Sequence, residues 1–580
     1  MTSMSKTPEQ IPLVSLKAEV SRTAIESIMV QVRLRARQRL GWDNERDLHA
    51  YEHVKAVFQA ANEALVPGTP FYPQILGPEE DWAVPTPLVF ESHRGWVGRI
   101  LVSFKKRILF PLNRWLHSYT WHNLQRQQRL NLLLLSAVES LAVAHARLRQ
   151  EMEGLRLLSS GAPPEVSPVP DPSRKHLPES AGARRMKLAF VVDRYGPDVP
   201  GGSERHCREF AERLAQRGHE VTVLTSCARD YVTWANAYPP GQQPDGPVSV
   251  IRFPVAAERD PDVWRDLSRL VFSGHGSEAD EVRWFRESGP YVPTLLEYLR
   301  GHQDRFDIFV FFSFRYYPTF AGLPLVAPRA VLVPTAEEDP AIRLGVLRKF
   351  FTLPLGIIHN TPEEQQLLRS VTRGAFPAFE VIGSGVAEAG PQPGEDLLER
   401  LGVRRPFILC LGRVDPNKGS ATLLSHFRRF VELEGEGVQL VLAGPAVMEV
   451  PEQRAVRVLG HVSEEDRSAL LHHMHALVAP SPFESLSLAL IEAWTHGRPA
   501  LVNGWCKVLR GQVTRADGGL YYENAAEFRE ALRLLLDAPG LAERLGLQGL
   551  EHARKEYAWP VVMDRLERFL QERLSTVTSA

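Results

Sequence analysis

Short apolar runs alternate with amphipathic stretches along the chain from residue 187 onward. The runs at 187–193, 219–226 and 307–313 are mostly apolar and predict buried β-strands. Between the first two runs, residues 203–218 place apolar side chains at three- and four-residue spacing, which predicts an amphipathic helix. A strand, a glycine-containing loop, a helix and a second strand form a βαβ unit. We therefore expect a parallel sheet that binds ligands at the carboxyl ends of its strands.

The same alternation predicts two sheets rather than one. A proline- and glycine-containing link with a short helix at 390–404 separates two groups of strands. Strands that alternate with helical stretches in each group predict doubly wound α/β domains. The further predicted strands are 248–255, 330–335, 356–361 and 379–386 before the link, and 405–414, 438–445, 477–479, 499–505 and 518–522 after it.

The first 184 residues follow a different pattern. Residues 20–65 have helical spacing and predict one or two helices, and residues 130–157 predict either a short coiled coil or a helix packed on the region before it. Residues 158–184 are rich in proline, serine and glycine, so we expect a flexible linker. The predicted organisation is a helical N-terminal region at 1–157, the linker at 158–184, α/β domains at 185–390 and 391–557, and a C-terminal helix at 558–580.

Residues 94–138 combine basic and aromatic side chains. No acidic residue occurs between Glu91 and Glu139, and tryptophan and phenylalanine are interleaved with arginine and lysine. This pattern is typical of a helix that lies on an anionic membrane surface, and the basic cluster at 105–107 argues against a spanning helix. An ordinary helix that covers a domain remains the alternative. A nucleic-acid patch is less favoured because no recognised binding module surrounds the segment.

Composition and charge narrow the class of protein. The chain has 580 residues, with 68 basic and 69 acidic side chains and a net charge of −1, so no overall field attracts nucleic acid. The four cysteines are far apart and predict reduced thiols rather than disulfides or a zinc site. We find no secretory signal and no run of about 18 apolar residues. These features predict a cytoplasmic protein. Any contact with a membrane would be peripheral and on the inner face of that membrane.

The stretch 479–499 carries the first candidate chemistry. A strand-like end is followed by Glu484, a Ser-Leu-Ser entry into a helix, and Glu492. The amino end of such a helix leaves N–H groups unpaired and is suited to a phosphate or diphosphate. The two carboxylates would accept hydrogen bonds from hydroxyls on either side of that diphosphate, as a sugar nucleotide offers. A surface helix with two solvated glutamates is the alternative interpretation.

Two motifs in this second domain resemble those of the family 4 retaining glycosyltransferases, which have the GT-B fold. The E-x7-E pattern is matched by Glu484 and Glu492. The G-R-x-x-x-x-K-G pattern is matched by Gly412-Arg413 and Lys418-Gly419, directly after a predicted strand. The resemblance covers residues 186 to about 575, roughly two thirds of the chain. It implies two Rossmann-like domains that face each other across a cleft, with the C-terminal helix crossing back to the first domain.

The resemblance also implies roles for particular residues. Arg413 and Lys418 would bind the diphosphate and stabilise the charge that develops on it, without a metal. Glu484 would contact the transferring sugar and belongs with these two cations among the catalytic candidates. The other substrate-binding candidates are the N–H groups of Leu486 and Ser487, Glu492 on the ribose, Gly412 in the diphosphate loop, and Gly201 and Gly202, which would let the first domain close on the donor.

One position departs from the family pattern. The strand at 330–335 is usually followed by a histidine near the reacting carbon, but here the sequence continues with Glu337, Glu338 and Asp339. Either a carboxylate replaces the histidine, with Glu337 as the substrate-binding candidate, or the site binds an unusual acceptor. Histidines also cluster at 472, 473 and 475, but neighbouring positions point to different faces of a helix. We therefore favour helix-end solvation over metal binding for them.

The predicted function is retaining transfer of a hexosyl group from a nucleotide-diphosphate sugar to a glycan or lipid-linked acceptor, as in cell-surface polysaccharide synthesis. The nucleotide sugar is a substrate, so no cofactor is expected. The alternative is a membrane-associated scaffold or regulatory protein that kept the fold and lost turnover. Two departures from the family pattern keep this alternative open: the missing histidine, and the Ser-Leu-Ser turn where the family usually has a glycine-rich turn. A sugar-nucleotide epimerase of the same fold is disfavoured, because the two motifs belong to the transferases.

Overall fold

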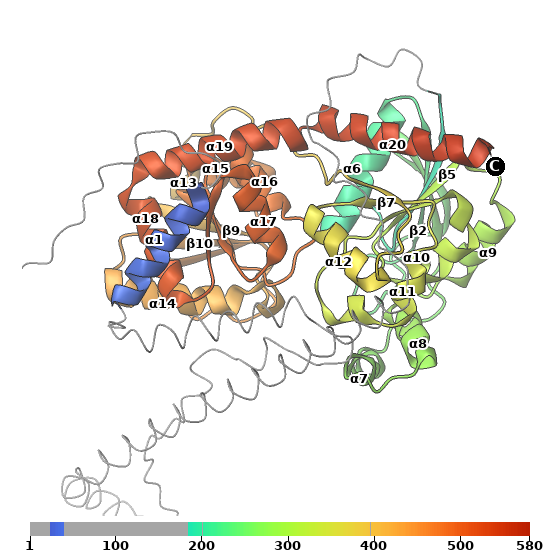
Figure 1. Cartoon of the computed structure of the whole chain (residues 1–580), viewed down its shortest axis with the longest axis horizontal. Coiled ribbons are helices and arrows are strands. Elements are labelled where there is room, and N and C mark those ends of the chain that lie inside the picture. The colour runs from blue at the N-terminus through green and yellow to red at the C-terminus, as the bar shows by residue number, and fades with distance from the viewer. Residues whose placement is uncertain (1–23, 40–183, 200, 395, 580) are drawn as a thin grey trace, which may run out of the picture. The chain divides into compact units, whose positions relative to one another are not determined.

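Two α/β domains make up most of the structure. The computed structural model describes residues 24–39, 184–199, 201–394 and 396–579. These residues form one eight-stranded and one six-stranded sheet, each flanked by helices (Figure 1). The doubly wound architecture predicted from the sequence is therefore confirmed. The predicted linker, the basic and aromatic segment at 94–138 and the segment at 130–157 lie outside the described residues.

The first sheet has the strand order β3-β4-β2-β1-β5-β6-β7-β8. Every neighbouring pair is parallel except β3 with β4. Strand β3 was missed by the sequence analysis because it is a polar edge strand that contains glycine and proline. The strands are β1 (Lys187–Val191), β2 (Glu220–Ser226), β3 (Gly241–Asp245), β4 (Val248–Phe253), β5 (Ile308–Phe312), β6 (Ala330–Val333), β7 (Gly356–His359) and β8 (Ala378–Val381).

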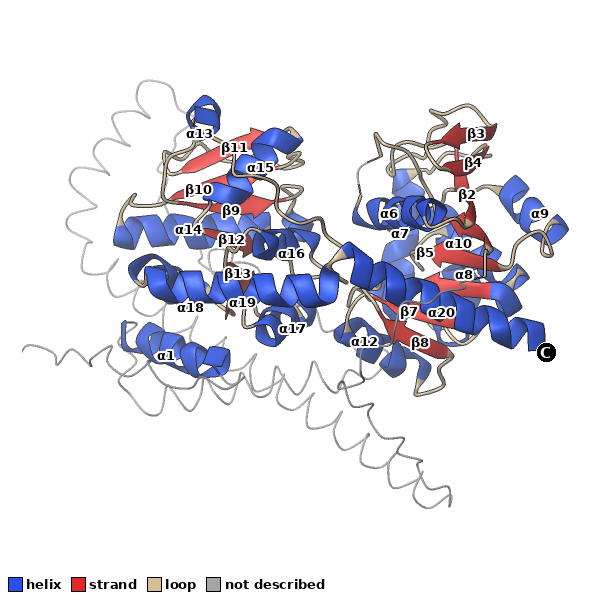
Figure 2. Ribbon diagram, turned by 90° about the horizontal axis from the view of Figure 1, so that it is seen from above, coloured by secondary structure: helices blue, strands red, loops and turns tan. Residues whose placement is uncertain are grey.

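Helices cover both faces of this sheet (Figure 2). Alternate residues of β1 enter two separate cores, with Ala189 and Val191 on one face and Leu188 and Phe190 on the other. A parallel strand buried on both faces is a continuous apolar run, which is why the sequence pattern predicts it well. The helices are α6 (Gly202–Gln216), α7 (Pro261–Phe272), α8 (Glu278–Ser288), α9 (Pro293–Gly301), α10 (Tyr317–Gly322), α11 (Val346–Phe350) and α12 (Pro362–Thr372).

The second sheet has the order β11-β10-β9-β12-β13-β14, and all its strand pairs are parallel. Its strands are β9 (Phe407–Leu411), β10 (Gln439–Ala443), β11 (Val456–Gly460), β12 (Ala476–Ala479), β13 (Ala500–Asn503) and β14 (Gly519–Tyr522). Its helices are α13 (Asp396–Leu401), α14 (Ser420–Glu434), α15 (Glu464–His473), α16 (Leu488–Thr495), α17 (Lys507–Ala516), α18 (Ala525–Asp537) and α19 (Pro539–Tyr557).

Strand order locates the candidate sites. In each sheet the order in which strands are added reverses at one point. This point lies between β1 and β5 in the first sheet and between β9 and β12 in the second. Ligands of doubly wound sheets bind at the carboxyl ends of the strands beside such a switch point. In this chain the loop after β1 leads to Gly202, the loop after β9 contains Arg413 and Lys418, and the loop after β12 contains Glu484.

The C-terminal helix α20 (Trp559–Ser579) returns to the first domain (Figure 2). Val562, Leu566 and Phe569 are buried in the same core as Phe190 and Phe210. The last helix of the chain therefore completes the hydrophobic core on one face of the first sheet. None of the helices within the described ranges is long and apolar enough to cross a membrane.

The N-terminal helix α1 (Ala24–Arg39) packs on the second domain, beside α18 and β14 (Figure 1). Its side chains Ile25, Met29 and Val32 are buried in the core of that domain. Arg33 lies 3.4 Å from Glu523, whose side chain is 4% exposed, and so places a cation beside a buried carboxylate. The sequence analysis treated this helix as part of a separate region, because a pairing across almost 500 residues leaves no local pattern.

This packing predicts that α1 contributes to the stability of the second domain. Met29→Ala should lower the free energy of unfolding by about 2–4 kcal/mol, because it removes a fully buried side chain. Val30→Ala on the same helix is the matched control, since Val30 is 51% exposed and its truncation should cost at most about 0.5 kcal/mol. Urea unfolding of the full chain measures both. Equal unfolding midpoints for the two variants would contradict the packing.

Candidate functional site

A cavity of about 330 Å³ lies between the carboxyl ends of strands from both sheets. This volume is at the lower end of the range of small-molecule binding sites. Loops after β6 and β7 and the start of α6 line it from the first domain, and loops after β9 and β12 line it from the second. Eight of the ten residues that the sequence assigns to the site line this cavity: Gly202, Glu337, Gly412, Arg413, Lys418, Glu484, Leu486 and Ser487.

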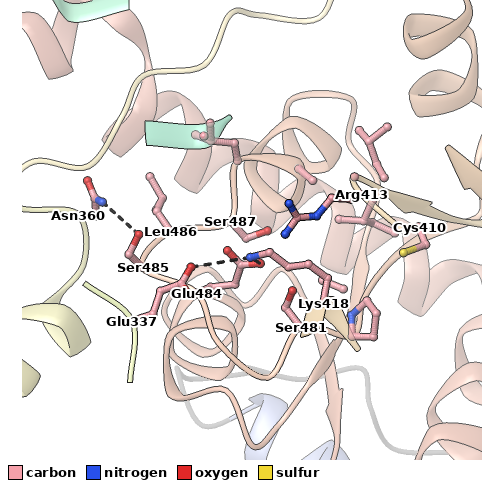
Figure 3. Close-up of a pocket in the computed structure, with 18 of the residues that line it drawn as sticks. Glu337, Asn360, Cys410, Arg413, Lys418, Ser481, Glu484, Ser485, Leu486 and Ser487 are labelled. Atoms are coloured by element: carbon pink, nitrogen blue, oxygen red, sulfur yellow. Dashed lines mark hydrogen bonds and ion pairs between the residues drawn. The ribbon is translucent and has the colours of Figure 1, made fainter. Parts of the chain in front are cut away.

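Arg413 and Lys418 face the cavity from the loop between β9 and α14 (Figure 3). Arg413 Nε lies 2.9 Å from Asp415 Oδ2, and Arg413 Nη1 donates a hydrogen bond of 2.6 Å to the Tyr231 hydroxyl of the first domain. Gly419 lets the loop approach the end of β12, since a Cβ there would lie 2.2 Å from the Pro480 carbonyl oxygen. The two predicted cations are therefore brought to one place.

Lys418 forms ion pairs with two carboxylates that line the cavity. Its Nζ lies 3.0 Å from Glu484 Oε1 and 3.8 Å from Glu337 Oε1, so it bridges the two domains (Figure 3). Burial opposes its charge, but Glu484 and Glu337 outweigh that effect and raise the pKa of Lys418. The lysine therefore stays protonated. A diphosphate that enters must compete with both carboxylates for it.

Glu337 lines the cavity from the segment after β6, the segment in which the family pattern has a histidine. Burial raises the pKa of Glu337 to about 7, with Lys418 opposing the shift and Glu484 adding to it. The backbone before it is strained, because Thr335 has a φ of 47°, which a β-branched residue rarely adopts. A carboxyl group thus lines the site from the first domain, and it changes charge near neutral pH.

The charge of Glu337 should make nucleotide binding depend on pH. Below pH 7 the protonated group no longer competes for Lys418, so nucleoside diphosphates should bind about threefold to tenfold tighter at pH 6 than at pH 8. Glu337→Gln should remove this part of the dependence. Titration calorimetry of both proteins measures it, and the difference between them cancels the titration of the nucleotide itself. Parallel pH profiles would contradict this role of Glu337.

A residue that the sequence analysis missed, Glu364, positions this wall of the cavity. Its carboxylate accepts hydrogen bonds from the backbone N–H groups of Ala336 and Asn360, which follow β6 and β7. Burial raises the pKa of Glu364 to about 8. Glu364 therefore ties together the two loops that carry Glu337 and Asn360. In the sequence it resembles any acidic residue in the first turn of a helix, and no motif distinguishes it.

Helix α16 begins directly after the second serine of the predicted Ser-Leu-Ser entry. Ser487 is the N-cap of this helix, and its hydroxyl accepts a hydrogen bond of 3.4 Å from the Leu490 N–H. The Ser487 N–H, predicted to bind phosphate, instead donates to Gln512 Oε1 at 3.2 Å. The cavity-lining residues in the first turn are Leu488 and Ala489, so their N–H groups are further candidates for the predicted contact with a phosphate.

Glu492 and Gly201 are not among the residues that line the cavity. Glu492 is 4% exposed and forms ion pairs with Arg467 and, at 3.2 Å, with Arg205 of α6. The pair with Arg205 therefore competes with a ribose hydroxyl for Glu492 Oε1. The assignment of Glu492 to the ribose, and that of Gly201 to donor closure, therefore stay predictions, and the structure shows α6 contacting the E-x7-E motif directly.

Hydrogen bonds across the cavity hold the Ser-Leu-Ser turn. Asn360 Nδ2 donates to Ser485 Oγ at 3.3 Å (Figure 3). Thr361 Oγ1 donates to the Ser485 carbonyl at 3.2 Å. Both donors belong to the first domain, at the end of β7. The turn that replaces the usual glycine-rich sequence is thus held by side-chain bonds from the opposite domain.

Of the three histidines near the end of α15, His473 is buried, which corrects the predicted solvation there, while His472 and His475 are half-buried. Their ring nitrogens contact backbone carbonyls: His472 that of Ser468 at 2.9 Å, His473 that of Pro393 at 3.1 Å, and His475 that of Leu535 at 2.8 Å. The His472 ring also lies 3.5 Å from the Ser468 hydroxyl. Within the described ranges, no three histidine, cysteine or acidic side chains come together as metal ligands.

Two family models match the two domains in order. Residues 405–538 match the model described as glycosyl transferases group 1, and residues 201–336 match the glycosyl transferase 4-like domain. Glycogen synthase of Mycobacterium tuberculosis is 25% identical over 404 residues, which cover 65% of this chain and 92% of the relative. Phosphatidyl-myo-inositol mannosyltransferase of Mycobacterium leprae is 25% identical over 406 residues, which cover 66% and 96%.

Solved structures share the arrangement of the two domains. Sucrose-phosphate synthase from Thermosynechococcus elongatus superposes with a TM-score of 0.52 and 18% identity, over 68% of this chain and all of that chain. At this identity the likeness concerns the fold alone. The two family models in order, together with the GT-B fold, support the assignment of this chain to the family 4 glycosyltransferases.

Proposed function

We propose that the protein is a retaining glycosyltransferase that transfers a sugar from a nucleotide-diphosphate donor to a glycan or lipid-linked acceptor. The convergence of Arg413, Lys418 and Glu484 on one cavity, with the start of α16 beside them, carries the proposal. Two cations and the amino end of a helix suit a diphosphate, and a neighbouring carboxylate suits sugar hydroxyls. Residues of the first domain line the same cavity.

The chemistry follows from where charge develops. As the glycosidic bond to the diphosphate breaks, negative charge grows on the leaving oxygen, and Lys418 and Arg413 stabilise it. Lys418 can do so because it turns from Glu484 and Glu337 toward the phosphate. The leaving phosphate takes the proton of the acceptor hydroxyl on the same face, so the configuration at the anomeric carbon is retained, as the resemblance implies. The fixed cations supply the charge, so we propose that transfer is independent of a metal.

The relatives support the acceptor class. One is named a glycogen synthase and another a phosphatidyl-myo-inositol mannosyltransferase, which supports a glycan or a lipid-linked acceptor for this chain. We propose that this chain serves cell-surface polysaccharide synthesis, with residues 94–138 on an anionic membrane surface. Co-sedimentation of the full chain with anionic vesicles, compared with a chain lacking 94–138, tests the surface contact. Equal sedimentation would reject it.

A panel of nucleotide sugars tests the proposed transfer. The purified chain is incubated with UDP-, GDP-, ADP- and dTDP-sugars together with glycan or lipid acceptors, and release of the free diphosphate is measured. We expect one or a few donors to be consumed and the product to keep the anomeric configuration of the donor. Inversion of configuration would contradict the retaining mechanism, and no consumption of any donor would contradict the enzyme.

A scaffold or regulatory protein that binds nucleotides is the second candidate. The pairing of both cations favours it, because Lys418 is held by two carboxylates and Arg413 by Asp415 and Tyr231. A site whose cations are already neutralised binds a diphosphate less tightly and gives it less stabilisation. Binding of a nucleoside diphosphate without release of sugar from any donor would favour this candidate over the enzyme.

A further inference from the structure

Two polar side chains at the start of α6, Ser203 and His206, line the cavity and have no role in the transfer described so far. Ser203 Oγ and His206 Nε2 are buried atoms without a hydrogen-bond partner among the described residues. His206 is 3% exposed. Buried polar atoms are nearly always paired, so two unpaired ones on the same cavity wall indicate that a ligand completes their hydrogen bonds.

The ring of His206 is held in one orientation. It makes edge contacts with Phe210 and Phe312, at centroid distances of 4.2 and 5.4 Å. Burial lowers the pKa of His206 to about 3, although a hydrogen bond to the backbone of Gly383 opposes the shift. The ring is therefore neutral and donates to Gly383 through Nδ1, because Nε2 is the unpaired nitrogen. The lone pair of Nε2 can only accept a hydrogen bond.

Ser203 and His206 are three residues apart on a helix, so their side chains lie on the same face. Together they offer one fixed acceptor and one hydroxyl that donates or accepts. Neither carries a charge, so the pair does not suit a phosphate. It suits a ligand with two neighbouring hydroxyls. The cations for the diphosphate belong to the second domain, whereas Ser203 and His206 line the same cavity from the first domain.

We propose that Ser203 and His206 form a subsite that binds two adjacent hydroxyls of the glycosyl group of the donor. This inference rests on the proposed function, since it assigns the sugar end of the same cavity. The hydroxyl that meets His206 donates to Nε2, and the neighbouring hydroxyl exchanges a hydrogen bond with Ser203 Oγ. The pair positions the sugar and selects its stereochemistry, while Arg413 and Lys418 hold the diphosphate.

Matched pairs of ligands test the subsite. UDP and UDP-glucose, ADP and ADP-glucose, and GDP and GDP-mannose are titrated into the full chain, and the pair that binds is used with Ser203→Ala, His206→Gln and His206→Phe. We expect the dissociation constant of the nucleoside diphosphate to stay within about twofold, because the cations are untouched. The tighter binding that the sugar provides should fall by about threefold to tenfold in Ser203→Ala and in His206→Phe. It should be partly kept in His206→Gln, whose amide oxygen can accept.

Deoxygenated donors sharpen the test. The wild-type chain should lose affinity when either of the two bound hydroxyls is removed, whereas Ser203→Ala should be insensitive to the loss of one and His206→Phe to the loss of the other. An unchanged contribution of the sugar in both variants would overturn the subsite. So would a change confined to the KM of the acceptor. If no pair binds to the wild-type chain, the proposed function fails and the subsite with it.

Discussion

Lys418→Ala should lower the turnover of the nucleotide-sugar donor by about a hundredfold to a thousandfold, the usual effect of removing one group that stabilises developing negative charge. Lys418 is the only cation that the structure, in its described part, places between Glu484 and Glu337, at 3.0 and 3.8 Å. Its removal takes one positive charge from the diphosphate site and leaves two carboxylates facing the ligand. Affinity for the nucleoside diphosphate should therefore fall as well, by about tenfold or more.

The control for this variant is Lys555→Ala, which removes an exposed lysine from α19, away from the cavity-lining residues. It should keep wild-type turnover and binding. Turnover is measured as release of the nucleoside diphosphate, binding by calorimetry, and the folded state by thermal unfolding of both variants. Wild-type turnover and affinity in a folded Lys418→Ala protein would contradict the assignment of this lysine to the diphosphate.

Glu484→Gln should separate turnover from nucleotide binding. Glu484 contacts Lys418 and sits in the turn before α16, where the transferring sugar is expected. Loss of its charge should reduce turnover by about a hundredfold, because the carboxylate no longer orients the sugar or holds Lys418 in place. The nucleoside diphosphate should bind as tightly as before or more tightly, because one negative charge has left the cavity.

Glu551→Gln on the exposed side of α19 is the matched control for the loss of one carboxylate. Single-turnover measurements with the donor found in the panel distinguish the chemical step from binding. If Glu484→Gln keeps the wild-type rate, Glu484 does not act on the sugar. If it loses nucleotide binding together with turnover, the residue belongs to the diphosphate site instead.

Much of the fold could be predicted because its strands are buried on both faces. Runs such as 187–193 and 307–313 are apolar throughout, and they became β1 and β5 at the centre of the first sheet. The edge strand β3 had no such pattern. The docking of α1 on the second domain could not be predicted, because Arg33 and Glu523 are nearly 500 positions apart and each is an ordinary surface residue in the sequence.

The candidate site, like the fold, could be predicted from the sequence only in part. Arg413, Lys418 and Glu484 follow strand ends next to a switch point, so motif spacing and topology agree on their place. The role of Glu364 depends on two backbone N–H groups from separate loops, which a sequence does not show. The pairing of Glu492 with Arg205 depends on how the two domains meet, so spacing alone could not reveal it.

A crystal structure of the full chain with its nucleotide-sugar donor is the decisive measurement. The diphosphate should lie within hydrogen-bond distance of Arg413 Nη1 and Lys418 Nζ, at the amino end of α16, with the glycosyl group between Glu484 and the start of α6. In that complex Lys418 should have turned away from Glu337. A donor bound elsewhere, or one that leaves Arg413 and Lys418 paired with their present carboxylates, would contradict the proposed site.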